Sequence, residues 1–229
     1  MSAARRSSAP ARAEMVTSND DEQAIVGALD AATVALVRAA AAVTAGSEDE
    51  MRTALTVAAA ETPPAWVEEL LLQTYLFAGF PRALNSMRIW RRVSGRPAPA
   101  DDRAAAFGNH AVWTRDGERT CAVVYGPFYD RLRTNIRALH PALDAWMVTD
   151  GYGKVLSRPE LDLRRRELCI VAACAASGQD RQLHSHLHGA LHAGATREEV
   201  TATLEAVAEL IDPANVDRYW HLWAKVSAK

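Results

Sequence analysis

The sequence predicts an all-α protein built from two similar helical halves. Apolar residues recur with the helical period from about residue 24 to residue 93, and again from residue 127 to residue 225. Only residues 120–124 are rich in β-formers, so we expect a short extended piece there, but no second strand pairs with it. A displacement of 130 residues aligns identical residues of the two halves, namely Glu68 with Glu198, Glu69 with Glu199, Ala78 with Ala208, Asn85 with Asn215, Arg88 with Arg218 and Trp90 with Trp220.

Breaks divide the first half into four expected helices. Gly46-Ser47 ends a helix that begins near residue 24, and Pro63-Pro64 ends the next and starts a third. Gly79-Phe80-Pro81 separates this third helix from a fourth over residues 82–93. Further along the chain, helices are expected over residues 127–139, 141–149, 197–211 and 214–225, with a turn at residues 150–153 and two helices within residues 161–200.

Composition separates four regions. Residues 1–20 are polar and rich in Ser, Ala and Arg, which is typical of a disordered tail and, as an alternative, of a transit peptide. Residues 21–95 are expected to form the first helical repeat, which is degenerate, and residues 96–124 a linker, which is rich in Pro and Ala at its start. Residues 125–229 form the second repeat, which carries the candidate site.

Charge and cysteine usage narrow the function classes. The net charge of −2 argues against a nucleic-acid partner, and no apolar run reaches the roughly 20 residues that span a membrane. Three cysteines without a CxxC spacing indicate no disulfide framework, so we expect a reducing, cytoplasmic location. A thiol redox protein that uses Cys169 or Cys174 remains a third alternative.

Polar residues interrupt two apolar helix faces within residues 161–200. Glu167 lies in the middle of the face formed by Leu163 and Val171, and His186 lies at the edge of a leucine stripe on the next helix. A buried isolated carboxyl group has a raised pKa and can exchange protons near neutral pH. If the two helices pack face to face, Glu167 and His186 form an acid–base pair. The alternatives are a core glutamate that caps a helix or pairs with an arginine, and a structural histidine.

Three motifs resemble the carboxymuconolactone decarboxylase family, which includes the alkyl hydroperoxidase D branch. They are Arg166-Glu167-Leu168, the Gln182-x3-His186 segment and the run Gly194-Ala195-Thr196-x-Glu198-Glu199-Val200. Residues 70–84 and 149–162 also resemble family segments, and the resemblance covers about residues 24–93 and 125–226. It implies all-helical homo-oligomers, and here two alkyl hydroperoxidase D-like repeats of which one retains a site.

The resemblance also separates two activities. The peroxidase branch has Glu-x11-Cys-x2-Cys-x3-His, and Gln179 and Gln182 occupy its cysteine positions here, so thiol peroxidase chemistry is rejected. The decarboxylase branch implies a cofactor-free lyase acting on a small carboxylated lactone or oxo acid, with Glu167 and His186 as the catalytic pair. A non-catalytic oligomeric scaffold or small-molecule binder is the alternative.

Further polar residues are candidates for substrate binding or for a metal. Gln182, Cys174 and His184 are expected to contact substrate, although Cys174 also suits simple core packing. His184, His188 and His192 follow the i, i+4, i+8 spacing with which histidines on one helix can bind zinc. No carboxylate or cysteine is suitably spaced as a further ligand, so we expect no metal here. We expect this face to be solvated or to form a subunit contact. The arginines at 164–166 either attract an anionic substrate or form a solvated helix face.

Overall fold

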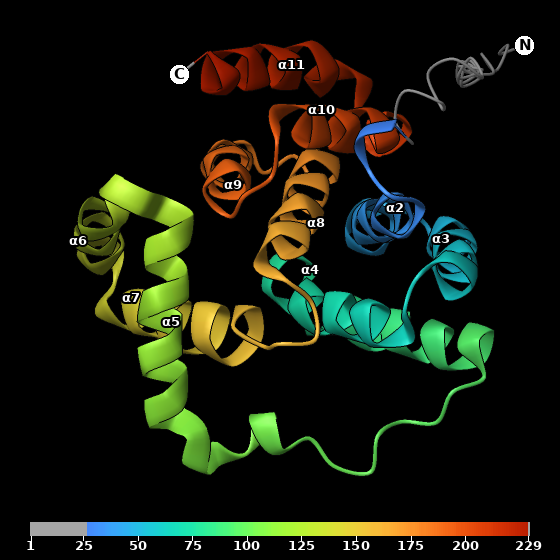
Figure 1. Cartoon of the computed structure of the whole chain (residues 1–229), viewed down its shortest axis with the longest axis horizontal. Helices are drawn as coiled ribbons and strands as arrows, with labels where there is room; N and C mark the ends of the chain where they lie inside the picture. The colour runs from blue at the N-terminus through green and yellow to red at the C-terminus, as the bar shows by residue number, and fades with distance from the viewer. Residues whose placement is uncertain (1–26, 229) are drawn as a thin grey trace, which may run out of the picture.

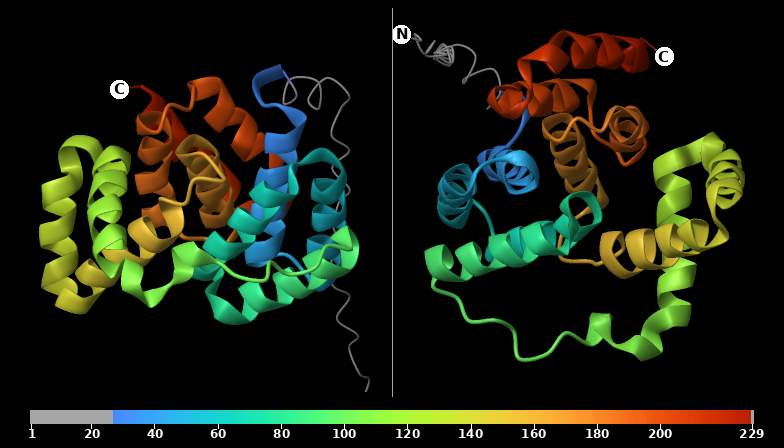
Figure 2. Two further views of the ribbon diagram at one scale, coloured as in Figure 1. Left: turned by 60° about the horizontal axis from the view of Figure 1, so that its bottom comes forward. Right: turned by 180° about the vertical axis from the view of Figure 1, so that it is seen from behind.

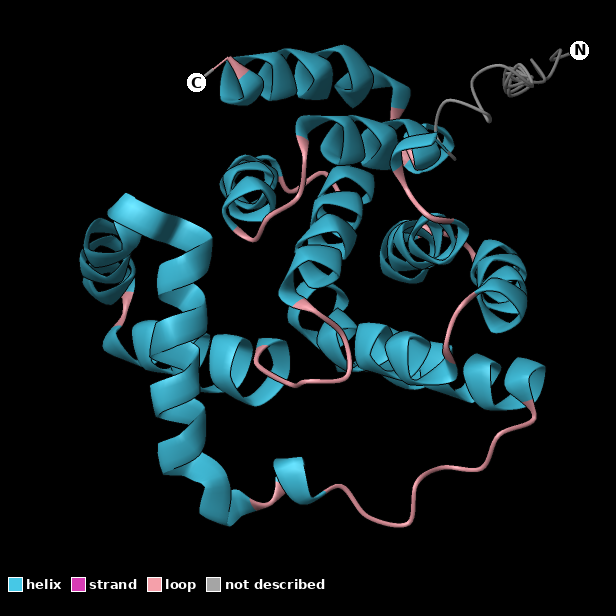
Figure 3. Ribbon diagram, viewed as in Figure 1, coloured by secondary structure: helices cyan, strands magenta, loops and turns pink. Residues whose placement is uncertain are grey.

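The computed structural model describes residues 27–228, and these residues form helices and no strand, which confirms the predicted all-α class (Figures 1 and 3). The tail predicted for residues 1–20 lies outside the described part of the chain. The α-helices are α2 (Ala31–Ala45), α3 (Glu48–Glu61), α4 (Pro64–Ser94), α5 (His110–Tyr125), α6 (Tyr129–Leu139), α7 (Pro141–Trp146), α8 (Leu163–Ala176), α9 (Asp180–His192), α10 (Arg197–Ala206) and α11 (Pro213–Ser227). Short 3-10 turns and one wide π-helical segment, η4 (Met147–Leu156), connect them.

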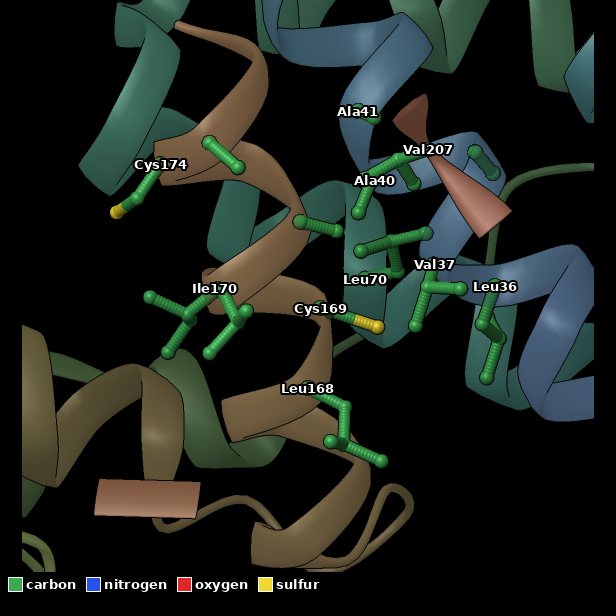
Figure 4. Close-up of a cluster of buried hydrophobic side chains, with 14 of the residues drawn as sticks. Leu36, Val37, Ala40, Ala41, Leu70, Leu168, Cys169, Ile170, Cys174 and Val207 are labelled. Carbon is green, nitrogen blue, oxygen red and sulfur yellow. The ribbon is translucent and has the colours of Figure 1, made fainter. Parts of the chain in front are cut away.

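Helices α2 and α8 form the centre of the molecule. Helix α2 packs against α8, α3 and α4 cover α2, and α9 and α10 cover α8, as Figures 1 and 2 show from three directions. Leu36, Val37, Leu168 and Ile170 are fully buried there, and each such side chain contributes about 1.5–3 kcal/mol. Figure 4 shows Cys169 pointing toward α2, whereas Cys174 points to the opposite side of α8. The two thiols therefore lie on different sides of this helix.

Local details agree with the two-half interpretation. Asp30 accepts a hydrogen bond from the Thr33 backbone amide at the start of α2, and Asp162 accepts one from the Arg165 amide at the start of α8. Arg88 bonds Asn85 on α4 just as Arg218 bonds Asn215 on α11. Trp90 and Trp220 differ, because the former is fully buried and the latter half-buried. The tandem repeat itself stays a prediction.

The break predicted at residues 79–81 is a kink within α4. Gly79 has φ 78° and ψ 163°, a conformation that glycine adopts far more readily than other residues, and Pro81 follows it. The loop predicted from residue 96 is shorter than expected, because α5 already begins at His110.

Two predictions for residues 120–153 are wrong. Residues 120–124 belong to α5 and are not extended. In a helix, Cys121 and Val124 lie on the same face, and both are buried in the core. Residues 150–153 are not a turn but part of η4, which crosses α5 at two glycines. A Cβ on Gly117 would lie 2.0 Å from the Val148 carbonyl oxygen, and one on Gly153 would lie 1.9 Å from that of Trp113. The glycines thus permit backbone contact between the two helices.

Across residues 27–228, we find no helix that combines the length and the apolar character required to cross a bilayer.

Candidate functional site

Glu167 and His186 are in direct contact between α8 and α9. Glu167 Oε2 lies 2.7 Å from His186 Nδ1, the Glu167 side chain is fully buried, and the His186 side chain is 6% exposed. The contact that the sequence predicted is therefore present. The catalytic role of the two residues stays a prediction.

The local sequence explains why the two side chains meet. Asp162 fixes the start of α8, and the three residues 177–179 then reverse the chain into α9, with Gly178 at φ 72°. Leu183 and Leu187, on either side of His186, are fully buried and hold α9 against the core. The apolar stripes therefore orient both polar side chains inward.

Gly189 provides the space for the carboxylate. A Cβ at this position would stand 2.5 Å from Glu167 Oε2 and 2.7 Å from Val124 Cγ1 of α5. The absence of a side chain at Gly189 therefore leaves the space that the Glu167 carboxylate occupies. A glycine one turn beyond His186, inside a helix, is the signal from which the sequence could have identified this residue.

Two atoms of the pair remain open to a further partner. Glu167 Oε1 is buried without a hydrogen bond to any described residue, which is uncommon for a buried carboxylate oxygen. His186 Nε2 has no hydrogen bond to another described residue either, and the Phe77 ring from α4 lies edge-on, with its centroid 5.9 Å from that of the imidazole. With the Nδ1 hydrogen directed at Glu167, Nε2 is the atom available for proton transfer.

Two tyrosines that the sequence reasoning missed lie on the α5 and η4 side of Glu167. Burial raises the pKa of Tyr125 to about 12, with hydrogen bonds to Tyr152 and Ser185 opposing this and the Glu167 charge adding to it. Burial, followed by Tyr125 and Glu167, also raises the pKa of Tyr152, and the two rings meet edge to face at 6.1 Å. Both phenols therefore stay protonated at neutral pH.

The predicted substrate-binding residues are only partly near the pair. Cys174 is buried, and burial together with the Glu167 charge raises its thiol pKa to about 12. Gln182 and His184 are exposed on α9, in contrast to the buried pair. The structure thus brings Cys174, but not these two, into the surroundings of Glu167.

The histidine-rich face of α9 makes ring contacts. The His184 and His188 rings lie 5.1 Å apart, His188 and His192 stack at 6.4 Å, and His192 Nδ1 lies 2.8 Å from the Val124 carbonyl oxygen. The part of the chain that the structure covers contains no group of three His, Cys, Asp or Glu side chains arranged to hold a metal ion. His184 and His192 are exposed and His188 is half-buried, so this face is largely open to solvent in the single chain, and His192 in addition contacts α5.

The arginines at 164–166 all form ion pairs. Arg164 pairs with Glu199, Arg165 pairs with Asp30 and Asp162 at 2.7 Å each, and the fully buried Arg166 pairs with Glu69 at 2.7 Å. For Arg166, both expected roles are therefore wrong. It joins α8 to α4 within the core, because Glu69 and Gln73 supply acceptors that the α8 sequence alone does not reveal.

Comparisons with known proteins place this chain among relatives of one family. A model of the carboxymuconolactone decarboxylase family matches residues 141–221, which include Glu167 and His186. Peroxisomal protein 2 of Schizosaccharomyces pombe is 30% identical over 146 residues, or 63% of this chain and 68% of that protein. Peroxisomal protein 2 of Saccharomyces cerevisiae is 26% identical over 159 residues, or 58% of this chain and 56% of that protein.

The names of these relatives bear on location, and they do not support the cytoplasm that cysteine usage predicted. On the family match, the similarity to the fission yeast protein and the helical architecture, this chain belongs to the carboxymuconolactone decarboxylase family.

Proposed function

We propose that this protein is a cofactor-free acid–base enzyme that decarboxylates a small carboxylated lactone or oxo acid. The observation that carries the proposal is the buried contact of 2.7 Å between Glu167 Oε2 and His186 Nδ1, with Nε2 available for a substrate. A carboxylate on one ring nitrogen fixes the tautomer and orientation of the imidazole, as in other histidine acid–base catalysts.

The chemistry needs one proton and one leaving group. The bond between the substrate carboxylate and its neighbouring carbon breaks, carbon dioxide leaves, and the electron pair moves into the conjugated carbonyl system. The His186 imidazolium, protonated on both nitrogens and held by the Glu167 carboxylate, donates its Nε2 proton to form the new carbon–hydrogen bond. The ring is then neutral, with its hydrogen on Nδ1, and Nε2 regains a proton from solvent. A poorly solvated carboxylate loses carbon dioxide more readily, and the apolar surroundings of His186, including Phe77, supply such an environment.

The test is a carbon dioxide release assay with a panel of carboxylated γ-lactones and β-oxo acids. We expect Glu167→Gln and His186→Ala to lower kcat/KM by about 100-fold or more, the usual contribution of a general acid or base. His110→Ala, which removes an exposed histidine of α5, serves as the matched control and should keep full activity. Unchanged turnover in both site variants would contradict the mechanism.

A non-catalytic oligomeric binder is the second candidate. One observation favours it, since the His186 side chain is only 6% exposed in the single chain. Saturable binding of a carboxylated ligand, with no turnover of any member of the panel by the wild type, would support this function instead.

Self-association is part of the proposal. Phe128 just before α6, Leu139 at the end of α6, and Leu143 and Trp146 on α7 are 47–73% exposed, and α6 buries none of its residues. An amphipathic helix without a buried residue is typical of a subunit contact. We expect sedimentation to show an oligomer that the double substitution Leu139→Lys/Trp146→Lys dissociates, while Val57→Lys on the exposed face of α3 does not.

The names of the relatives favour a peroxisomal location over the cytoplasm. Fractionation of source cells with antibodies against this chain tests the location, because cofractionation with a peroxisomal matrix marker is expected and recovery in the cytosol would contradict it.

A further inference from the structure

A second candidate site lies between α9 and α11, the two helices that neighbour each other near the C-terminus in Figure 1. The cavity there has a volume of about 510 Å³, which lies within the usual range for small-molecule sites. Its lining consists of Asp180, Arg181, His184, Ser185, Arg218, Tyr219, His221, Leu222 and Lys225. None of these residues belongs to the buried pair.

The lining carries an excess of positive charge. Arg181, Arg218 and Lys225 are cationic, and Asp180 is the one acidic residue of the lining. The charge of Asp180 is already used, because it accepts hydrogen bonds of 2.9 Å from Arg218 Nη2 and from the Tyr219 hydroxyl group. The side chains of Arg181 and Lys225 make no hydrogen bond or ion pair with another described residue, so both cations are available to a ligand.

The remaining lining residues indicate an organic ligand. Leu222 and the buried Tyr219 ring form apolar walls, while His184, His221 and Ser185 can donate hydrogen bonds to oxygen atoms. An arginine fork binds a carboxylate with two parallel hydrogen bonds, and a lysine contributes a point charge. Two available cations suit a ligand with at least two negative groups.

We propose that the cavity between α9 and α11 binds a small organic di- or tricarboxylate through Arg181 and Lys225. The site is separate from the Glu167–His186 pair, because α9 directs His186 toward the core and directs Arg181 and His184 toward the cavity. It therefore does not depend on the proposed decarboxylation.

Calorimetric titration of the full chain with tricarballylate at constant ionic strength tests this site. Saturable binding is expected, and the double variant Arg181→Gln/Lys225→Gln should weaken it by at least 10-fold. The control variant Arg88→Gln/Arg92→Gln removes the same charge from exposed positions of α4 and should change the affinity by less than 2-fold. Circular dichroism verifies that each variant is folded, and Arg181→Lys should retain most of the binding.

Four results would overturn the proposal, three of them from the titration and one from NMR spectra. The first is the absence of saturable tricarballylate binding, and the second is equal affinity in the wild type and in Arg181→Gln/Lys225→Gln. The third is inorganic phosphate binding as tightly as tricarballylate with the same dependence on these two residues, because the cavity would then recognise negative charge without an organic ligand. Movement of the His184 and His221 ring signals in NMR spectra on addition of tricarballylate locates the ligand in this cavity, and unmoved signals would place it elsewhere.

Discussion

Gly189 lies so close to Glu167 that a single methyl group at its Cα would stand 2.5 Å from the carboxylate oxygen bonded to His186. The acid–base pair therefore depends on an absent side chain as much as on the two residues that form it. This relationship gives a prediction that separates the geometry of the pair from its chemistry.

Gly189→Ala should displace the Glu167 carboxylate without removing any ionisable group. Overpacking a core typically costs about 1–3 kcal/mol, against a gain of about 0.5–1 kcal/mol from alanine in a helix. We expect a net loss of about 1–2 kcal/mol in urea unfolding and a clear loss of any decarboxylase activity. Gly108→Ala is the control, since no atom lies within 4 Å of the place that its new methyl group would occupy. Wild-type stability in Gly189→Ala would show that the carboxylate can move freely.

All three cysteines should be unreactive in the native protein. Burial raises the thiol pKa of Cys121, Cys169 and Cys174 to about 12. Only about 1 in 10,000 of each thiol is then ionised at pH 8, and the thiolate is the nucleophile. Mass spectrometry after iodoacetamide treatment should find no label in the folded protein and three labels in 6 M guanidinium chloride. Rapid labelling of Cys169 or Cys174 in the folded state would contradict this prediction and support the thiol redox alternative.

Asp144→Asn should destabilise the α6–α7 arm in a pH-dependent manner. Hydrogen bonds from Arg133 lower the pKa of the Asp144 carboxyl group, and those from Arg137 lower it further. Burial of the carboxyl group opposes this effect but is outweighed. A lowered pKa in the folded state gives stability that is present above the unfolded value near 4 and is lost as the pH falls through the folded value. We expect a loss of about 1–3 kcal/mol at pH 7 that shrinks toward zero below pH 4.

Urea unfolding at pH 7, 4 and 2.5 measures this dependence, with the exposed Asp217→Asn as control. A difference between wild type and Asp144→Asn that stays constant from pH 7 to pH 2.5 would contradict the assignment.

Glu69→Gln should be among the most destabilising single changes. Glu69 pairs with the fully buried Arg166 at 2.7 Å and with Arg158 at 2.8 Å. Burial lowers the pKa of the Arg166 guanidinium, and the hydrogen bond and charge of Glu69 oppose this effect. Removal of the Glu69 carboxylate therefore leaves a buried cation without its counter-charge. The expected cost is about 3–5 kcal/mol, compared with less than about 1 kcal/mol for Glu48→Gln at the exposed Arg52 pair. Thermal unfolding compares the two, and similar midpoints would show that water reaches Arg166.

The sequence predicts patterns within single helices, but it does not predict contacts between helices that are far apart along the chain. The positions of Glu167 and His186 followed from the 3.6-residue period, because both interrupt apolar stripes. The burial of Arg166 depends on Glu69 and Gln73, almost 100 positions earlier, so no local pattern could reveal it. Residues 120–124 misled the prediction because their β-forming side chains also make one apolar helix face, and burial outweighed intrinsic propensity. Tyr125 and Tyr152 were missed because the crossing of α5 and η4 at Gly117 and Gly153 places them there.

The reversal at residues 177–179 joins the two helices that supply Glu167 and His186. Both residues of the proposed acid–base pair thus come from one continuous helical hairpin of a single polypeptide. If the protein forms the proposed oligomer, separation of the subunits by dilution should leave the contact between Glu167 and His186 intact. A dependence of the proposed activity on protein concentration would then report how the substrate is enclosed, and not whether these two residues are in contact.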